Sequence, residues 1–145
     1  IMNCKDATFM SSTFWTDRIG PTAALKTLEI MENEKIVQNS KDMGDYMMGK
    51  LEELYKYDIV GHVRGGKGLL NAVEIVKNKD TKEPFPADFN LAKKLSVLFN
   101  KYKMIGLPSP SSINLAPPIS VSKDEVDDLF ERVENIVRDL ESDIK

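Results

Sequence analysis

A run of hydroxyl side chains near the start of the chain is the strongest candidate for binding chemistry. Ser11, Ser12, Thr13 and Thr16 lie just ahead of Gly20-Pro21, where a helix is expected to begin because proline suits the first helical turn. The N–H groups and dipole of a helix start favour an anion such as a phosphate. From local physics alone, however, a loop whose hydroxyls cap the helix is the simpler interpretation.

A second candidate is the glycine-rich stretch Gly65-Gly66-Lys67-Gly68. Clustered glycines let backbone N–H groups face an anion. A phosphate-binding P-loop, however, needs a serine or threonine directly after the lysine and a helix after that. Here a glycine follows the lysine and a strand is expected next. The stretch therefore predicts a hairpin turn.

Several kinds of site are excluded by the residue counts. The chain has one histidine, His62, and one cysteine, Cys4, so it offers neither a zinc-binding Cys/His cluster nor a convincing Ser/His/Asp set. His62 is expected to be a strand residue with an ordinary hydrogen bond. The acidic pair Asp127-Asp128 reads as the solvated face of a helix. We therefore predict no metal site and assign no catalytic residue.

The composition of the chain limits the kinds of partner that it can be expected to bind. The chain has 145 residues, 41% of them hydrophobic, with a formal net charge of -3. Such a chain has the length of one domain and no positive field that would attract nucleic acid. No stretch approaches the roughly 18 apolar residues of a membrane span, and a lone cysteine fits a reducing cytoplasm. We expect a soluble, cytoplasmic protein, and we expect a fragment because the chain opens with Ile1 instead of methionine.

The spacing of apolar residues predicts the helices and strands that carry these candidate residues. Helical spacing begins at Gly20-Pro21 and is read as far as Ile36. Three further helices are expected, and the last begins with a capping box formed by Ser122 and Glu125. These three helices are predicted over Met43–Leu54, Phe89–Tyr102 and Ser122–Ile144.

Three strands are predicted at Asp58–Arg64, Leu69–Val76 and Ser112–Ala116. The first two are joined by the glycine turn, so that pair is antiparallel. The order of elements predicts an α+β fold: a small, antiparallel-rich sheet of three to four strands covered by helices and preceded by a long helix.

Three segments together resemble the class III aminotransferases. Thr13-Phe14-Trp15 leading into the alanine-rich helix around Ala23-Ala24-Leu25 resembles one family segment. Val63-Arg64-Gly65-Gly66-Lys67-Gly68-Leu69-Leu70-Asn71-Ala72-Val73-Glu74 resembles the family's glycine-turn hairpin. Leu115-Ala116-Pro117-Pro118, continuing to Glu125, resembles its strand-to-helix passage. The segments follow the family's order and spacing and cover nearly the whole chain.

The resemblance implies a fold-type-I enzyme that uses pyridoxal 5'-phosphate (PLP) and acts as a homodimer. Such an enzyme moves an amino group from a small amine or amino acid to a keto acid or aldehyde. Residues 1–19 would be left from the large PLP-binding domain, and residues 20–145 would form the C-terminal small domain. The lysine that holds PLP would lie upstream, so the fragment alone is expected to be inactive. Two alternatives stay open: an aminomutase or racemase on the same scaffold, and a self-standing, non-catalytic α+β module.

The resemblance also implies two binding positions. Thr13 matches a threonine that contacts the PLP phosphate of the neighbouring subunit, with Ser12 or Thr16 as substitutes because the residues after it depart from the family pattern. Asn114 stands where ornithine-type members carry an arginine that clamps the substrate carboxylate. An amide cannot replace that charge, so the ornithine and acetylornithine assignments lose support. Sugar, amine and ω-amino acid aminotransferases and the glutamate-semialdehyde aminomutase type remain.

Overall fold

The structure, a computed structural model, describes residues 13–14 and 17–144. The chain divides into two compact units, Ile1–Glu34 and Lys35–Lys145. The predicted boundary between residues 19 and 20 concerns the domains of a longer protein and stays a prediction. In the first unit, α1 (Ile19–Asn33) buries none of its residues. Leu25 and Leu28 are among its exposed apolar side chains.

The first predicted helix is shorter than expected. Its apolar spacing was read through Ile36, but α1 ends at Asn33 and α2 (Ile36–Glu52) begins at Ile36. The physical reason lies at Lys35, whose left-handed backbone (φ 52°) precedes α2 and cannot continue a right-handed helix. Including Ile36 in the first helix was therefore wrong.

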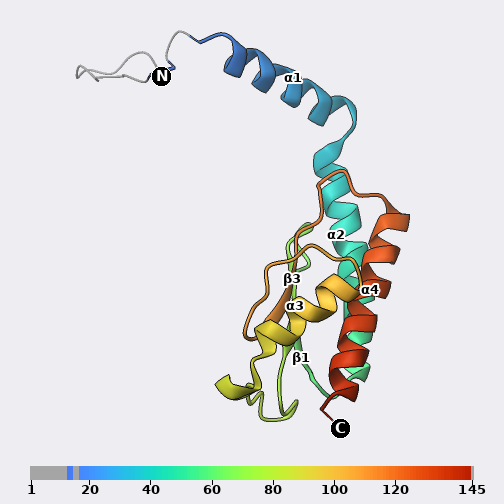
Figure 1. Ribbon diagram of the computed structural model, residues 1–145. Coiled ribbons are helices and arrows are strands. Elements are labelled where there is room, and N and C mark those ends of the chain that lie inside the picture. The colour runs from blue at the N-terminus through green and yellow to red at the C-terminus, as the bar shows by residue number, and fades with distance from the viewer. Residues whose placement is uncertain (1–12, 15–16, 145) are drawn as a thin grey trace, which may run out of the picture. The chain divides into compact units, whose positions relative to one another are not determined.

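The second unit is built on a three-stranded sheet in the order β1-β2-β3 (Figure 1). β1 spans Val60–Arg64, β2 spans Asn71–Ile75, and β3 spans Ser112–Leu115. Both neighbouring pairs are antiparallel. The predicted strands and the predicted hairpin at Gly65–Gly68 are confirmed.

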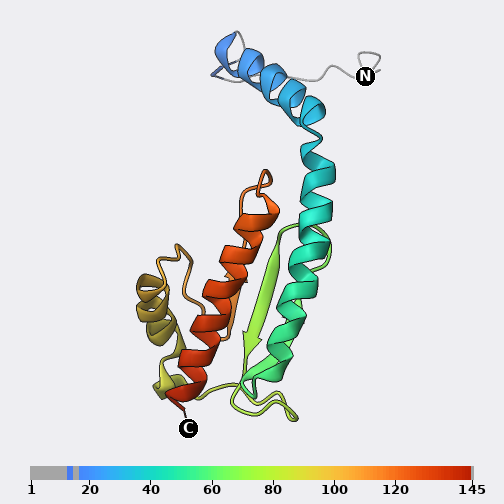
Figure 2. The same cartoon turned by 90° about the vertical axis from the view of Figure 1, so that its right-hand side faces the viewer.

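Helices cover one face of this sheet. α2 lies beside α4 (Lys123–Ser142), and α3 (Leu91–Lys101) packs against α4 (Figure 2). Short 3₁₀ helices, η1 (Glu53–Lys56) and η2 (Ala87–Phe89), complete the order of elements. The inward side chains of β1 and β2, Val63 and Val73, join helix side chains in one buried core. The predicted α+β fold is confirmed.

Polar contacts fix the pairing of α2 with α4. The Tyr46 hydroxyl on α2 donates to Oδ1 of Asp127 on α4 at 2.6 Å. That bond to a carboxylate raises the pKa of Tyr46 to about 12.

At the start of α4, Glu125 N–H donates to Ser122 Oγ at 3.3 Å and Ser122 N–H donates to Glu125 Oε2 at 2.8 Å. The predicted capping box is confirmed.

A close contact between α2 and the β1–β2 hairpin joins two glycines, Gly44 and Gly68. Gly44 is buried on α2, and a Cβ added there would lie 2.5 Å from the carbonyl carbon of Gly68. Gly68 has φ +85°, a conformation that other residues rarely adopt. Both positions therefore require glycine, and together they set how closely the helix sits on the hairpin.

We predict that Gly44→Ala lowers the free energy of unfolding by about 1–3 kcal/mol, because the added methyl collides with backbone instead of a movable side chain. Gly49→Ala is the matched control, since it lies on the same helix and an added Cβ there meets nothing within 4 Å among the described atoms. The control is expected to gain about 0.5–1 kcal/mol from helix propensity. Urea unfolding of the purified chains measures both. Equal stability of the two variants would contradict the contact.

Candidate functional site

The face of the sheet turned away from the helices carries the polar side chains. Successive strand residues alternate between faces. Because Val63, Val73 and Ile113 are buried, their strand neighbours point the other way. We call this surface the open face of the sheet; it comprises His62, Arg64, Ala72, Glu74, Ser112 and Asn114, of which Ser112 is buried.

Within the open face, three residues form a row across the strands. Arg64 on β1 pairs with Ala72 on β2, and Ala72 pairs with Asn114 on β3. These residues and the adjoining Gly65, Leu70 and Asn71 line a surface depression of about 310 Å³. Asn114, proposed from the sequence as a substrate contact, therefore shares a depression with Arg64. Sequence reasoning did not single out Arg64 as a binding residue.

The polar groups of this row are loosely held. Nη1 of Arg64 lies 3.6 Å from Oε1 of Glu74, farther than an ordinary hydrogen bond, and half of the arginine side chain is exposed. Asn114 is also exposed, and its Oδ1 accepts a hydrogen bond from Ser112 Oγ at 3.1 Å. That bond uses one of the two lone pairs of the amide oxygen, and the amide nitrogen carries two N–H donors.

Asn71 holds the hairpin that carries Arg64. Its side chain is 3% exposed, and its Oδ1 accepts from Gly66 N–H at 3.3 Å. Its Nδ2 donates to the carbonyl of Gly68 at 3.4 Å. One buried amide thus satisfies two backbone groups of the glycine turn and fixes the end of β1.

The second candidate position, Thr13, lies in the first unit and is exposed. Its proposed substitutes, Ser12 and Thr16, lie outside the described residues. The start of α1 carries a different group: the Asp17 carboxylate accepts from Ile19 N–H at 3.3 Å and from Gly20 N–H at 3.1 Å. Two amides that a phosphate could have used are thus occupied by an acidic side chain. A phosphate contact at Thr13 would therefore depend on its hydroxyl more than on the helix end.

The remaining chemical candidates have ordinary roles. His62 Nδ1 lies 3.1 Å from the Tyr55 hydroxyl, as expected for a strand histidine with one hydrogen bond. Among residues 13–14 and 17–144, no group of three or more His, Cys, Asp or Glu is placed to hold a metal ion. Within the same residues, no helix combines the length and apolar character needed to cross a membrane.

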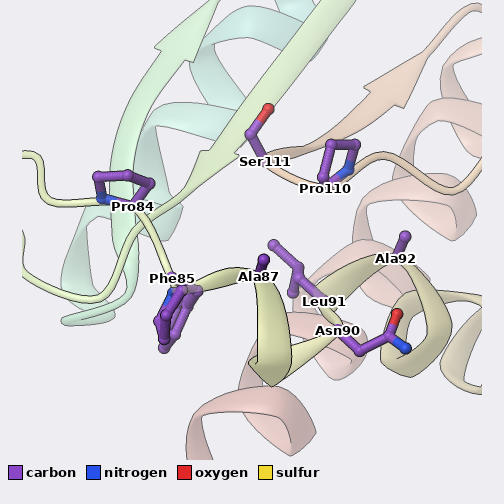
Figure 3. A pocket seen from close by; sticks show the side chains of 9 residues that line it. Pro84, Phe85, Ala87, Asn90, Leu91, Ala92, Pro110 and Ser111 are labelled. Atoms are coloured by element: carbon purple, nitrogen blue, oxygen red, sulfur yellow. The ribbon is translucent and has the colours of Figure 1, made fainter.

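A larger hollow of about 410 Å³ lies between η2, the start of α3 and the segment before β3 (Figure 3). Phe85, Leu91 and Pro110 are among its lining residues. Phe85 stacks on Phe89 with ring centroids 4.2 Å apart. The described residues that line this hollow include no ionisable side chain, so it offers little chemistry.

Comparison with known proteins identifies the family of this chain. The model for "Aminotransferase class-III" matches residues 1–137. The chain belongs to the class III aminotransferases. It is 34% identical over 136 residues to a taurine–pyruvate aminotransferase from Bilophila wadsworthia, covering 90% of this chain and 30% of that protein. It is also 33% identical over 120 residues to an alanine/serine racemase from Pyrococcus horikoshii, covering 81% of this chain and 24% of the relative.

Solved structures agree on the fold of this class III domain. A thermostable (S)-enantioselective ω-transaminase from Thermomicrobium roseum is 32% identical and superimposes with a TM-score of 0.84. The match covers 94% of this chain and 30% of that one. The chain thus spans about a third or less of the length of these relatives.

We predict that the pKa of Asp17 lies below its ordinary value of 3.8, because the amides of Gly20 and Ile19 stabilise the carboxylate. The stabilisation is fully present above the unfolded-state pKa and is lost as the pH falls through the lowered folded-state pKa. The first turn of α1 should then fray. An NMR titration of the Asp17 carboxyl and of the two amides measures this. In Asp17→Asn the amide chemical shifts of Ile19 and Gly20 should show no such pH-dependent transition. A wild-type Asp17 carboxyl with a pKa of 3.8 or above would contradict the cap.

Proposed function

We propose that this chain is the small-domain part of a PLP-dependent aminotransferase that moves an amino group between an amine or amino acid and a keto acid or aldehyde. Residues 1–19 would belong to the large domain and residues 20–145 to the small one. The observation that carries the proposal is the family match over residues 1–137, in a chain that covers about a third or less of its relatives. The lysine that holds the cofactor would lie in the remaining part of the protein.

PLP is the proposed cofactor, and when bound it would supply the electron sink for the reaction. Thr13 would donate its hydroxyl to the phosphate, in a homodimer whose neighbouring subunit holds the cofactor. The exposed position of Thr13 is compatible with that role. Asp17 supports a hydroxyl contact in preference to a helix-end site, because its carboxylate already occupies the first amides of α1.

The proposed donor is an amine or an ω-amino acid. Asn114 lacks the fixed charge with which an arginine would clamp an α-carboxylate, which argues against ornithine and acetylornithine. Two named relatives point in the same direction, since one is a taurine–pyruvate aminotransferase and another an ω-transaminase. A racemase is the second candidate, because one relative carries that name, but the aminotransferase reading has the larger share of the named relatives.

A donor panel on the full-length protein tests this function. With pyruvate as acceptor, the wild type should transfer the amino group of amines and ω-amino acids well and that of ornithine poorly. Asn114→Arg should shift preference towards ornithine by adding the guanidinium. Racemisation of alanine or serine without transfer would favour the second candidate. A wild type that prefers ornithine would contradict the role of Asn114.

We predict that Thr13→Val in the full-length protein weakens PLP binding by roughly 1.5–3 kcal/mol, the worth of one hydrogen bond to a charged group. Valine keeps the shape of threonine and removes the hydroxyl. Thr13→Ser is the matched control, since it keeps the donor and should bind PLP nearly as well as the wild type. Equilibrium dialysis of the apoprotein measures both affinities. An unchanged affinity in Thr13→Val would move the contact to Ser12, Thr16 or backbone groups.

A further inference from the structure

The open face of the sheet carries the guanidinium of Arg64, which has no role in the proposed function so far. We propose that Arg64, together with Asn114, binds the acidic end of the substrate, a carboxylate or a sulfonate. This inference rests on the proposed aminotransferase activity and deepens it by naming the group that recognises the far end of the donor.

Arg64, Ala72 and Asn114 lie in one row across the three strands. Neighbouring strands are about 4.8 Å apart, so the outer two backbones stand roughly 10 Å apart. The short side chain of Ala72 leaves the space between them empty, and the depression there has a volume of about 310 Å³. That volume is at the lower end for small-molecule sites, which suits a donor of a few carbon atoms.

The polar side chains of Arg64 and Asn114 line this space. The Arg64 guanidinium carries N–H donors in a planar fork that matches a carboxylate. Asn114 can contribute the two N–H donors of its amide nitrogen, while its oxygen accepts from the Ser112 hydroxyl. Both side chains that flank Ala72 thus present donors, and two donors with a net positive charge select an anion.

Arg64 is accessible to a ligand. Its contact with Glu74 is long, 3.6 Å, and half of its side chain is exposed. An exposed pair at that distance contributes little to stability, so a ligand anion can take over the guanidinium at small cost. Leu70 lines the same depression and is 74% exposed, which provides an apolar wall for the carbon chain next to the acid.

The site would also offer a guanidinium to the substrate although position 114 carries an amide. In the ornithine-type pattern the guanidinium comes from β3 itself. Here it would come from β1, on the far side of Ala72, and would therefore hold an acid at a different point of the pocket. A donor whose acid group is remote from its amine fits this displacement better than one whose carboxylate is on the same carbon.

The test compares three donors of similar length on the full-length holoenzyme: 3-aminopropanoate, 2-aminoethanesulfonate and propylamine. Arg64→Gln should raise KM about ten- to a hundredfold for the acidic donors, as expected for loss of a hydrogen bond to a charged group, and leave kcat nearly unchanged. Propylamine, which lacks the acid, should be used equally well by variant and wild type. An effect confined to one acidic donor identifies whether the site takes a carboxylate or a sulfonate.

Arg138→Gln is the matched control, because it removes the same charge from an exposed position on α4. Its KM values should equal those of the wild type. If Arg64→Gln leaves both acidic donors unchanged, or slows propylamine as strongly as the acids, Arg64 is not an anion-binding residue. A wild type that transfers no amino group from any donor would instead sink the proposed function, so the two failures are distinguishable.

Discussion

The arrangement of the second unit depends on one constraint: among its described residues, helices cover one face of the small sheet (Figure 2). Val63, Val73 and Ile113 must be buried under α2 and α4, so the alternate residues of each strand have to face the other side. A shift of one residue in the register would bury Arg64 and Asn114 and expose the core. The hydrophobic pattern that stabilises the fold therefore also determines which polar groups share the open face.

The packing of α2 on this sheet also explains why the β1–β2 hairpin has glycine and asparagine at particular positions. Gly44 and Gly68 let α2 approach the turn at backbone contact distance, and Asn71 satisfies the backbone groups inside it. A bulkier turn would lift the end of β1 away from the helix. Arg64 is the last residue of β1, so the position of its guanidinium depends on this packing.

Much of the fold could be predicted from the sequence because its signals are local. The capping box at Ser122 and Glu125, the glycine turn and the strand alternation each act over a few residues. The left-handed backbone at Lys35 carries no such signal, and the apolar spacing runs through it to Ile36. The Asp17 cap was not predicted, because hydroxyl and carboxylate side chains both precede α1 and the sequence does not show which of them bonds its first amides. The placement of Arg64 and Asn114 on either side of Ala72 depends on the register of both strand pairs, which spacing along the sequence does not determine.

We propose that this class III domain acts together with a PLP cofactor that a lysine elsewhere in the full-length protein holds. The most direct measurement is to reduce the PLP-loaded full-length protein with borohydride and map the modified lysine by mass spectrometry. We expect a single pyridoxyl-lysine, upstream of this chain. Stoichiometric modification of any lysine within these 145 residues would contradict it.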